Sequence, residues 1–211
     1  MAPFARPPAT HFRVVQRRVP PGSPGAGRFA AGPHAEATID LAATSLPTAV
    51  TEWMAARPGV APSGSVVELP VTNDTTAAVT VGTVDTDAVT AYTNGQCHAL
   101  ALALAERTGW PLVAIGHPEP CHMDDCPVGA DGMCDCQIEH VAVQRPDGSI
   151  LDIEGVSPRS AYVDDDDPDF DELFAIAPER LEKLAGDGWA SWPDPDLVTA
   201  RGFVDVVLAG P

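Results

Sequence analysis

The 211-residue sequence lacks the features that would indicate a membrane, export or a nucleotide. No apolar run reaches the roughly 18 residues that a membrane-spanning helix needs. Residues 1–8 lack the apolar stretch of a secretory signal. The glycines of 22–27 follow no predicted strand and include no P-loop lysine. We therefore expect a cytoplasmic protein with no membrane partner, whose five cysteines are reduced and serve metal binding or catalysis.

Basic residues are also scarce. Twelve lysines and arginines stand against 30 acidic residues, and the net charge is −18. An acidic surface repels nucleic acid, so we expect no nucleic-acid partner for the core. Five arginines nevertheless precede the first acid, Glu36, in a segment rich in proline. We expect residues 1–35 to be a disordered or loosely attached basic arm, and 36–211 to be a single domain with a cysteine-rich insertion at 117–137.

The domain is predicted to be α+β. Helices bounded by capping residues and by proline or glycine are expected at 45–57 and 95–108, a short helix at 178–185, and a last helix or mixed segment from Asp194. Segments rich in β-branched and apolar residues predict short strands at 66–71, 77–84, 112–115, 141–144 and 150–154. We expect the second helix to pack on a small antiparallel β-sheet.

Cys97 lies in the first turn of the second predicted helix, which Thr93 and Asn94 are expected to cap. The helix dipole and the unpaired N–H groups at this end favour a negative charge, so they would stabilise a thiolate. The same N–H groups could hold an oxyanion, with Asn94 or Gln96 adding a side-chain donor. A cysteine that is only a small buried apolar residue is the alternative interpretation.

A β-hairpin is predicted around Arg145-Pro146-Asp147-Gly148. A type I turn followed by a left-handed glycine would pair Arg145 with Ser149. His140 would then lie opposite Glu154 and diagonally across from Asp152, at a separation that a histidine and a carboxylate can bridge. A two-residue turn would instead point Asp152 to the other face.

Cys97, His140 and Asp152 therefore supply the residue types of a catalytic triad. A nucleophilic thiol needs a base, and the base needs a third group to fix its ring. Glu154 is a substitute for the third position. Taken singly, His140 is better explained as a half-buried strand residue and Asp152 as a solvent-facing acid near a turn.

Three segments resemble the papain-like and transglutaminase-like cysteine superfamily, at a distance. They lie within residues 91–156 and are Asn94–Ala101, Glu139–Val143 and Leu151–Gly155. Members of that superfamily carry a cysteine at a helix N-terminus, then a histidine on a strand, then an aspartate or asparagine on the next strand. The resemblance implies a papain-like or transglutaminase-like core.

By this resemblance Cys97 is the nucleophile, His140 the general base and Asp152 the orienting carboxylate. It implies a cysteine peptidase, amidase or transglutaminase-like enzyme, with a peptide, protein or small amide as substrate. The sequence departs from better-known members because no tryptophan follows Cys97, and no glutamine stands several residues before it.

Four further cysteines fall within sixteen residues of the insertion, at Cys121, Cys126, Cys134 and Cys136. The segment between them has little apolar content, so one structural Zn²⁺ held by four thiolates would supply the stability that it lacks. Two disulfides or four free thiols are the alternatives. A catalytic metal is not expected, because four thiolates leave no open position.

The sequence thus supports two hypotheses about function. The first is a cysteine-dependent hydrolase or acyltransferase that acts on an amide or acyl bond through Cys97, His140 and Asp152. The second is a non-catalytic, zinc-stabilised binding or accessory protein of the same fold. The reactivity of the Cys97 thiol discriminates between them.

Overall fold

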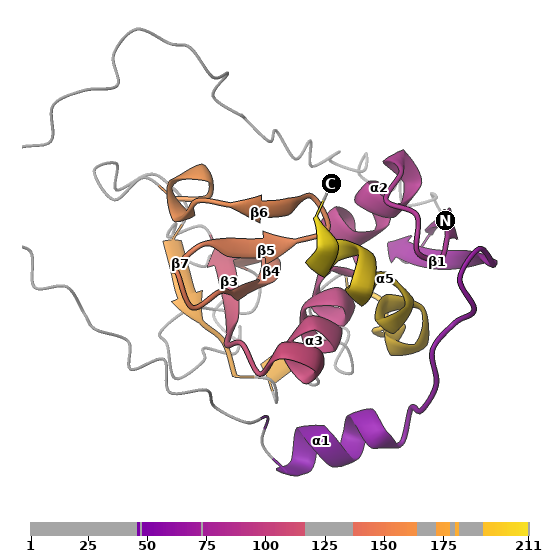
Figure 1. The fold of residues 1–211 in the computed structure, drawn as a ribbon, viewed down its shortest axis with the longest axis horizontal. Helices are drawn as coiled ribbons and strands as arrows, with labels where there is room; N and C mark the ends of the chain where they lie inside the picture. Colours follow the sequence, from indigo (N-terminus) through magenta and orange to yellow (C-terminus); the bar gives the residue numbers. More distant parts are fainter. Residues whose placement is uncertain are drawn as a thin grey trace, which may run out of the picture. The chain divides into compact units, whose positions relative to one another are not determined.

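Helix α3 (Cys97–Thr108) packs on a five-stranded antiparallel β-sheet in the computed structural model of the chain (Figure 1). The structure describes residues 46, 48–72, 74–116, 137–163, 172–177, 180–181 and 192–210. All of them lie within the unit Ile39–Pro211. The predicted arm at 1–35 and residues 117–136 of the predicted insertion lie outside the described residues.

The five-stranded sheet has the order β6-β5-β4-β3-β7, and every neighbouring pair is antiparallel. Its strands are β3 (Leu112–Gly116), β4 (Ile138–Gln144), β5 (Ile150–Asp152), β6 (Gly155–Ser157) and β7 (Glu172–Ala175). The chain therefore has the predicted α+β class, with helices packed against antiparallel sheets.

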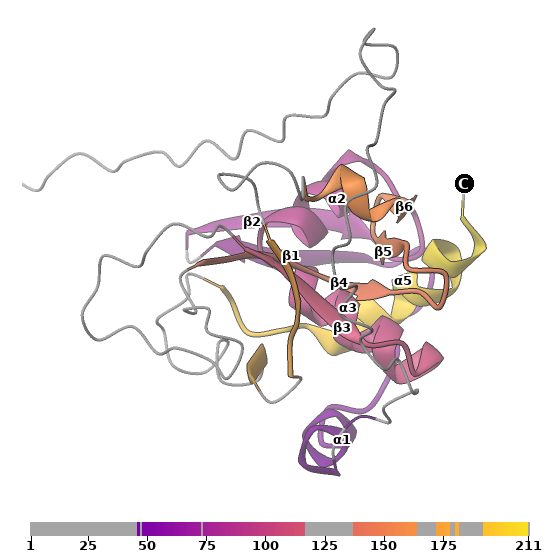
Figure 2. The same cartoon turned by 90° about the vertical axis from the view of Figure 1, so that its left-hand side faces the viewer.

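Helix α3 lies between the sheet and the C-terminal helix α5 (Leu197–Ala209), as Figures 1 and 2 show. Every residue from Cys97 to Ala105 is buried, on all sides of the helix. A helix that is apolar all round is one that the protein covers all round. The Cys97 end of α3 is therefore held by packing on both flanks, and Gly109, at φ 71°, ends the helix as predicted.

A second, two-stranded sheet of β1 (Val66–Thr72) and β2 (Thr75–Thr80) packs against helix α2 (Thr86–Asn94). The sequence interpretation continued the second strand to 84, which is wrong: the strand ends at Thr80, and Gly82 turns the chain at φ 79°. It also missed α2. Asp85 caps this helix, its Oδ1 accepting a 2.9 Å hydrogen bond from the Ala88 N–H.

The predicted hairpin between β4 and β5 is confirmed in its turn and register. Gly148 has φ 83°, and the Arg145 N–H donates to the Ser149 carbonyl at 2.8 Å. Val143 then pairs with Leu151. The strand β5 ends earlier than predicted, at Asp152, where the chain turns into β6.

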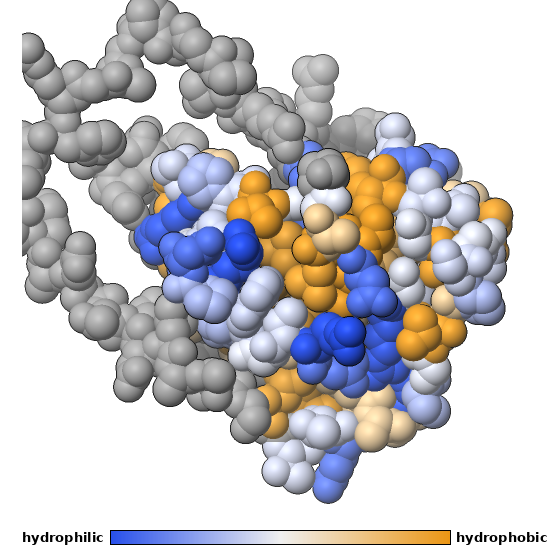
Figure 3. Space-filling model, viewed as in Figure 1, coloured by the Kyte–Doolittle hydropathy of each residue, from blue (hydrophilic) through white to orange (hydrophobic). Residues whose placement is uncertain are grey.

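Part of the molecular surface is apolar. Val156 of β6 and Leu208 of α5 are 52% and 37% exposed, and Figure 3 shows hydrophobic surface between these two elements. Within the described residues, no helix is both long enough and apolar enough to cross a bilayer.

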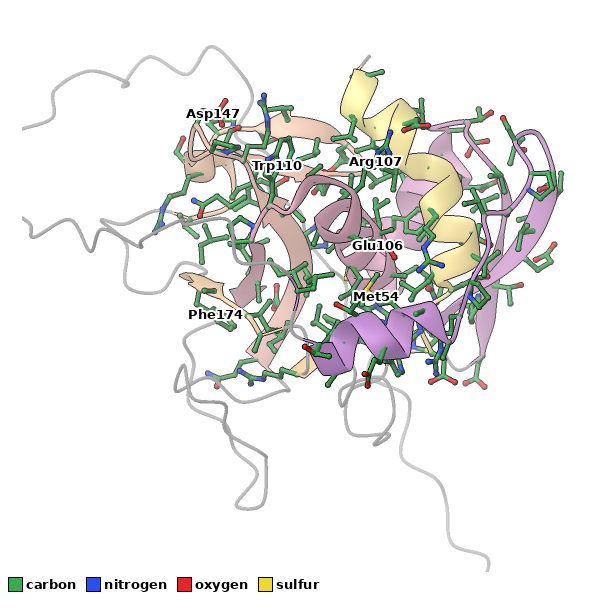
Figure 4. All side chains as sticks on the ribbon, turned by 60° about the horizontal axis from the view of Figure 1, so that its bottom comes forward. Met54, Glu106, Arg107, Trp110, Asp147 and Phe174 are labelled. Atoms are coloured by element: carbon green, nitrogen blue, oxygen red, sulfur yellow. The ribbon has the colours of Figure 1, made fainter. Side chains whose placement is uncertain are left out.

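Arg201 of α5 joins three elements. Its guanidinium forms a two-pronged ion pair with Glu106 of α3, at 2.7 and 3.0 Å. It also donates to the carbonyls of Met54 and Arg57, at the end of α1 (Thr48–Ala55). Figure 4 views the structure from the side of α1, with Met54 and Glu106 labelled. This side chain thus fastens α1 and α5 to the helix that carries Cys97.

Arg201→Ala should lower the free energy of unfolding by about 2–3 kcal/mol, because it leaves a carboxylate and several carbonyls without their donor. Arg107→Ala is a matched control, since Arg107 also joins α3 to α5 but only reaches Asp205 at 3.8 Å, with both side chains exposed. It should cost less than about 0.5 kcal/mol. Urea unfolding of both variants measures the difference, and equal losses would contradict the role of Arg201.

Candidate active site

Cys97 is the first residue of α3 and is 3% exposed. The residue before it, Gln96, takes the N-cap position without a side-chain capping bond. The N–H groups of the first turn have no partner within their own helix, and they place a partial positive charge around the sulfur. The structure thus places Cys97 where a helix end favours a thiolate.

His140 of β4 and Asp152 of β5 meet side by side on neighbouring strands. The His140 Nε2 lies 3.1 Å from the Asp152 Oδ2, and both side chains are largely buried. The other oxygen, Oδ1, accepts a 2.8 Å hydrogen bond from the backbone N–H of Glu154. Because Nε2 faces the carboxylate, the remaining ring nitrogen, Nδ1, is the one available to the thiol.

His140 also interacts with Cys97, and the two groups shift each other's ionisation. Burial alone raises the pKa of the Cys97 thiol, but the interactions of the sulfur with His140 and, to a smaller extent, with His98 outweigh burial and lower the pKa to about 6. Burial opposes the charged form of His140 as well, yet Asp152 and Cys97 raise its pKa to about 10. At a pH between these two pKa values, the favoured state of the pair is a thiolate beside an imidazolium.

Asp152 is the carboxylate partner of His140. Burial raises the pKa of its carboxyl group, but the hydrogen bonds from His140, Tyr162 and the Glu154 N–H outweigh burial and lower it. The carboxylate therefore stays ionised at neutral pH and steadies the imidazolium. The structure brings together all three residues that the sequence analysis singled out.

Comparison with known proteins gave no relative. No protein-family model, no curated protein and no solved structure matches the chain. The likeness to papain-like and transglutaminase-like proteins remains a prediction, which rests on the residues and on the geometry described above.

His98 was not predicted as a site residue from the sequence. Its side chain is fully buried, and its ring lies against that of Trp192 with centroids 5.1 Å apart. Neither ring nitrogen makes a hydrogen bond of good geometry within the described structure. His98 nevertheless lies close enough to the Cys97 sulfur to help lower the pKa of the thiol. Its position directly after Cys97 was the signal in the sequence that could have identified it.

The side-chain oxyanion donors proposed from the sequence are used elsewhere. The Gln96 amide group donates to the carbonyls of Pro70 and Asp194, at 3.0 and 3.2 Å. Asn94 does not cap α3: it is the last residue of α2, and its amide donates to the Thr90 carbonyl at 2.9 Å. Neither amide is available to an oxyanion, so the backbone N–H groups of the α3 terminus are the donors that remain.

Glu154 does not stand opposite His140, because β5 ends two residues before it. Its backbone N–H donates to the Asp152 carboxylate. The role of Glu154 as a substitute for Asp152 stays a prediction from the sequence.

The predicted zinc ligands Cys121, Cys126, Cys134 and Cys136 lie outside the described residues. Within the described part of the chain, no three metal-binding side chains gather in a way that could hold a metal ion. A structural zinc at the four cysteines stays a prediction from the sequence.

Proposed function

We propose that the chain is a cysteine-dependent hydrolase or acyltransferase of papain-like or transglutaminase-like type, acting on an amide or acyl bond of a peptide, protein or small amide in the cytoplasm. One observation carries this proposal. The His140 imidazole lies 3.1 Å from a buried carboxylate through Nε2 and acts on the Cys97 thiol at the N-terminus of α3. These are the relations that a nucleophile, its base and the orienting group require.

The proposed reaction begins with the Cys97 thiolate, which attacks the carbonyl carbon of the substrate. A carbon–sulfur bond forms, and the backbone N–H groups at the start of α3 stabilise the oxyanion. The tetrahedral intermediate then collapses and breaks the bond to the leaving amine or alcohol, which takes its proton from the His140 imidazolium. Asp152 holds the ring in one orientation throughout.

The thioester that results is resolved by a second nucleophile. Water gives hydrolysis, and an amine gives acyl transfer. In either case neutral His140 accepts a proton from the attacking group, the carbon–sulfur bond breaks, and the thiolate–imidazolium pair returns. The same three side chains therefore serve both reactions, and the identity of the second nucleophile decides between them.

A second candidate is a non-catalytic, zinc-stabilised binding or accessory protein of the same fold. The observation in its favour is the burial of Cys97, which is 3% exposed and belongs to the main apolar core cluster. A thiol of that kind would contribute packing without reacting.

Iodoacetamide labelling between pH 4 and 10 separates the two functions, with peptide mass spectrometry to locate the adduct on Cys97. The enzyme hypothesis predicts a half-maximal labelling rate near pH 6, because the thiolate is the reactive form. In urea the midpoint should lie near the ordinary pH of about 8.5. Cys97→Ser supplies the background from the other four thiols. A Cys97 that reacts only after denaturation would rule out the enzyme and leave the binding protein.

A further inference from the structure

Asp152 has a third partner that the sequence analysis did not find. The hydroxyl group of Tyr162 donates to the Asp152 Oδ2 at 2.8 Å, the same oxygen that faces the His140 Nε2. With the Glu154 N–H on Oδ1, both oxygens of the carboxylate are engaged. Because the donors engage both oxygens, rotation of the carboxylate would lose at least one of these bonds.

Tyr162 is itself held in place. It follows the short 3-10 helix η2 (Arg159–Ala161), and its N–H donates to the Arg159 carbonyl at 3.0 Å. Its ring packs against the small apolar cluster of Val113, Ala142 and Ile150. The ring also lies parallel to that of His140, with an angle of 4° and centroids 6.5 Å apart. Its hydroxyl therefore reaches Asp152 from a fixed position.

The hydroxyl remains a donor across the working pH range. Burial and the negative charge of Asp152 both raise the pKa of Tyr162, and Glu154 adds a smaller effect in the same direction. A protonated phenol that faces an ionised carboxylate can only donate to it. The bond is thus charge-assisted at every pH at which the thiolate–imidazolium pair forms.

We propose that Tyr162 is a positioning residue for His140, because its hydroxyl holds the carboxylate of Asp152 in the orientation in which Oδ2 meets the imidazole. The inference rests on the proposed function, since it assigns a role within the same triad. Tyr162 takes no direct part in the reaction described above. It acts on the reaction only through Asp152 and His140.

Tyr162→Phe tests the inference, because it removes the hydroxyl and keeps the ring beside His140. The measurement is the pKa of His140, followed by NMR of the histidine ring C–H signals and assigned by the loss of one signal in His140→Ala. Without the hydroxyl the carboxylate turns away from the imidazole. The pKa of His140 should then fall by about one unit, as expected for the loss of one hydrogen bond to a charged group.

Tyr92→Phe is the matched control. Tyr92 is the other of the two tyrosines in the chain, and its buried hydroxyl has no hydrogen-bond partner within the described structure. Its removal should leave the pKa of His140 unchanged. The fall caused by Tyr162→Phe should also disappear in an Asp152→Asn background, because there is then no charged group to position. A merely structural role of Tyr162 would change stability without this dependence on Asp152.

The possible outcomes are distinct. An unchanged pKa of His140 in Tyr162→Phe overturns the inference. A raised pKa of His140 overturns it too, because it would mean that the Tyr162 hydroxyl weakens the negative charge of the carboxylate and does not orient it. A wild-type His140 that titrates near the ordinary value of about 6.5 would instead remove the ion pair and with it the proposed function. A raised value in the wild type that falls in Tyr162→Phe supports both.

Discussion

His140→Ala should move the midpoint of Cys97 labelling from about pH 6 to about pH 8.5 or above, the ordinary range of a thiol. The variant removes a hydrogen bond and a positive charge from the sulfur, and it leaves the burial that raises the pKa of the thiol. The sign follows from the charges: a neighbouring cation favours the thiolate, so losing it requires a higher pH for ionisation.

The labelling rate of Cys97 should change less in His140→Ala than the fraction of thiolate does. At pH 6 the thiolate fraction should fall from about one half to below about 1%. Each thiolate of the higher pKa is however roughly ten times more nucleophilic. Labelling at pH 6 should therefore slow by about 10-fold, whereas labelling at pH 10 should not slow.

Two further variants serve as comparisons for the shift of the labelling midpoint in His140→Ala. Asp152→Asn keeps the size of the side chain but removes the charge beside His140, so the midpoint should rise by less than in His140→Ala. Asn94 lies close to the thiol in sequence, but its exposed amide donates within α2, to Thr90 and Thr93, so Asn94→Ala should leave the midpoint at about pH 6. If the midpoint stays at its wild-type value in His140→Ala, the imidazole does not act on the thiol and the proposed triad is wrong.

The His140–Asp152 contact could be predicted because it depends on local rules. The four residues Arg145–Gly148 determine a turn with a left-handed glycine, and the turn sets the register of the two strands that it joins. Alternation along β4 and β5 then places His140 and Asp152 on one face. The position of Cys97 in the first turn of a helix could be predicted for the same reason. The apolar residues of α3 and the glycine that ends it, Gly109, lie in one short segment of the sequence.

Other parts of the site depend on contacts between residues far apart in the chain. The Gln96 amide binds Pro70, Asp194 and Asp196, and these partners follow only from the packing of β1 and the segment before α5 on the start of α3. His98 is covered by Trp192, which is again remote in sequence. A sequence pattern does not show which remote residues will contact a side chain. Gln96 was therefore predicted as an oxyanion donor, but in the fold its amide group is already bonded to Pro70 and Asp194.

Helix α2 shows the same limit in secondary structure. Its sequence, Thr86–Asn94, contains three threonines and an asparagine, which are weak helix formers. It forms because Asp85 caps it and because Ala88, Ala91 and Tyr92 are buried. Tertiary burial here outweighs local preference, and the prediction that treated Asn94 as the cap of the next helix failed for that reason.

Gly95→Ala should destabilise the protein by more than about 4 kcal/mol, the range reached when backbone has no room to adjust. Gly95 lies between α2 and α3, where β1 passes against the chain. A Cβ atom at this position would lie 2.0 Å from the Val71 carbonyl oxygen and 2.7 Å from the Val71 carbonyl carbon. Both are backbone atoms of a paired strand, so no side-chain rotation can relieve the overlap. The φ of Gly95, −176°, is open to any residue, so the expected cost is steric.

Gly109→Ala is the control. Gly109 ends helix α3 at φ 71°, and a Cβ atom there would meet nothing within 4 Å. It should cost only about 1 kcal/mol, the penalty of a left-handed alanine. Urea unfolding of the two variants measures the contrast, and iodoacetamide labelling of folded Gly95→Ala reports on the site. Where β1 is pushed away, the first turn of α3 moves with it, and the labelling midpoint should rise above its wild-type value. A Gly95→Ala protein as stable as Gly109→Ala, with an unshifted midpoint, would show that the contact with β1 does not hold Cys97 in place.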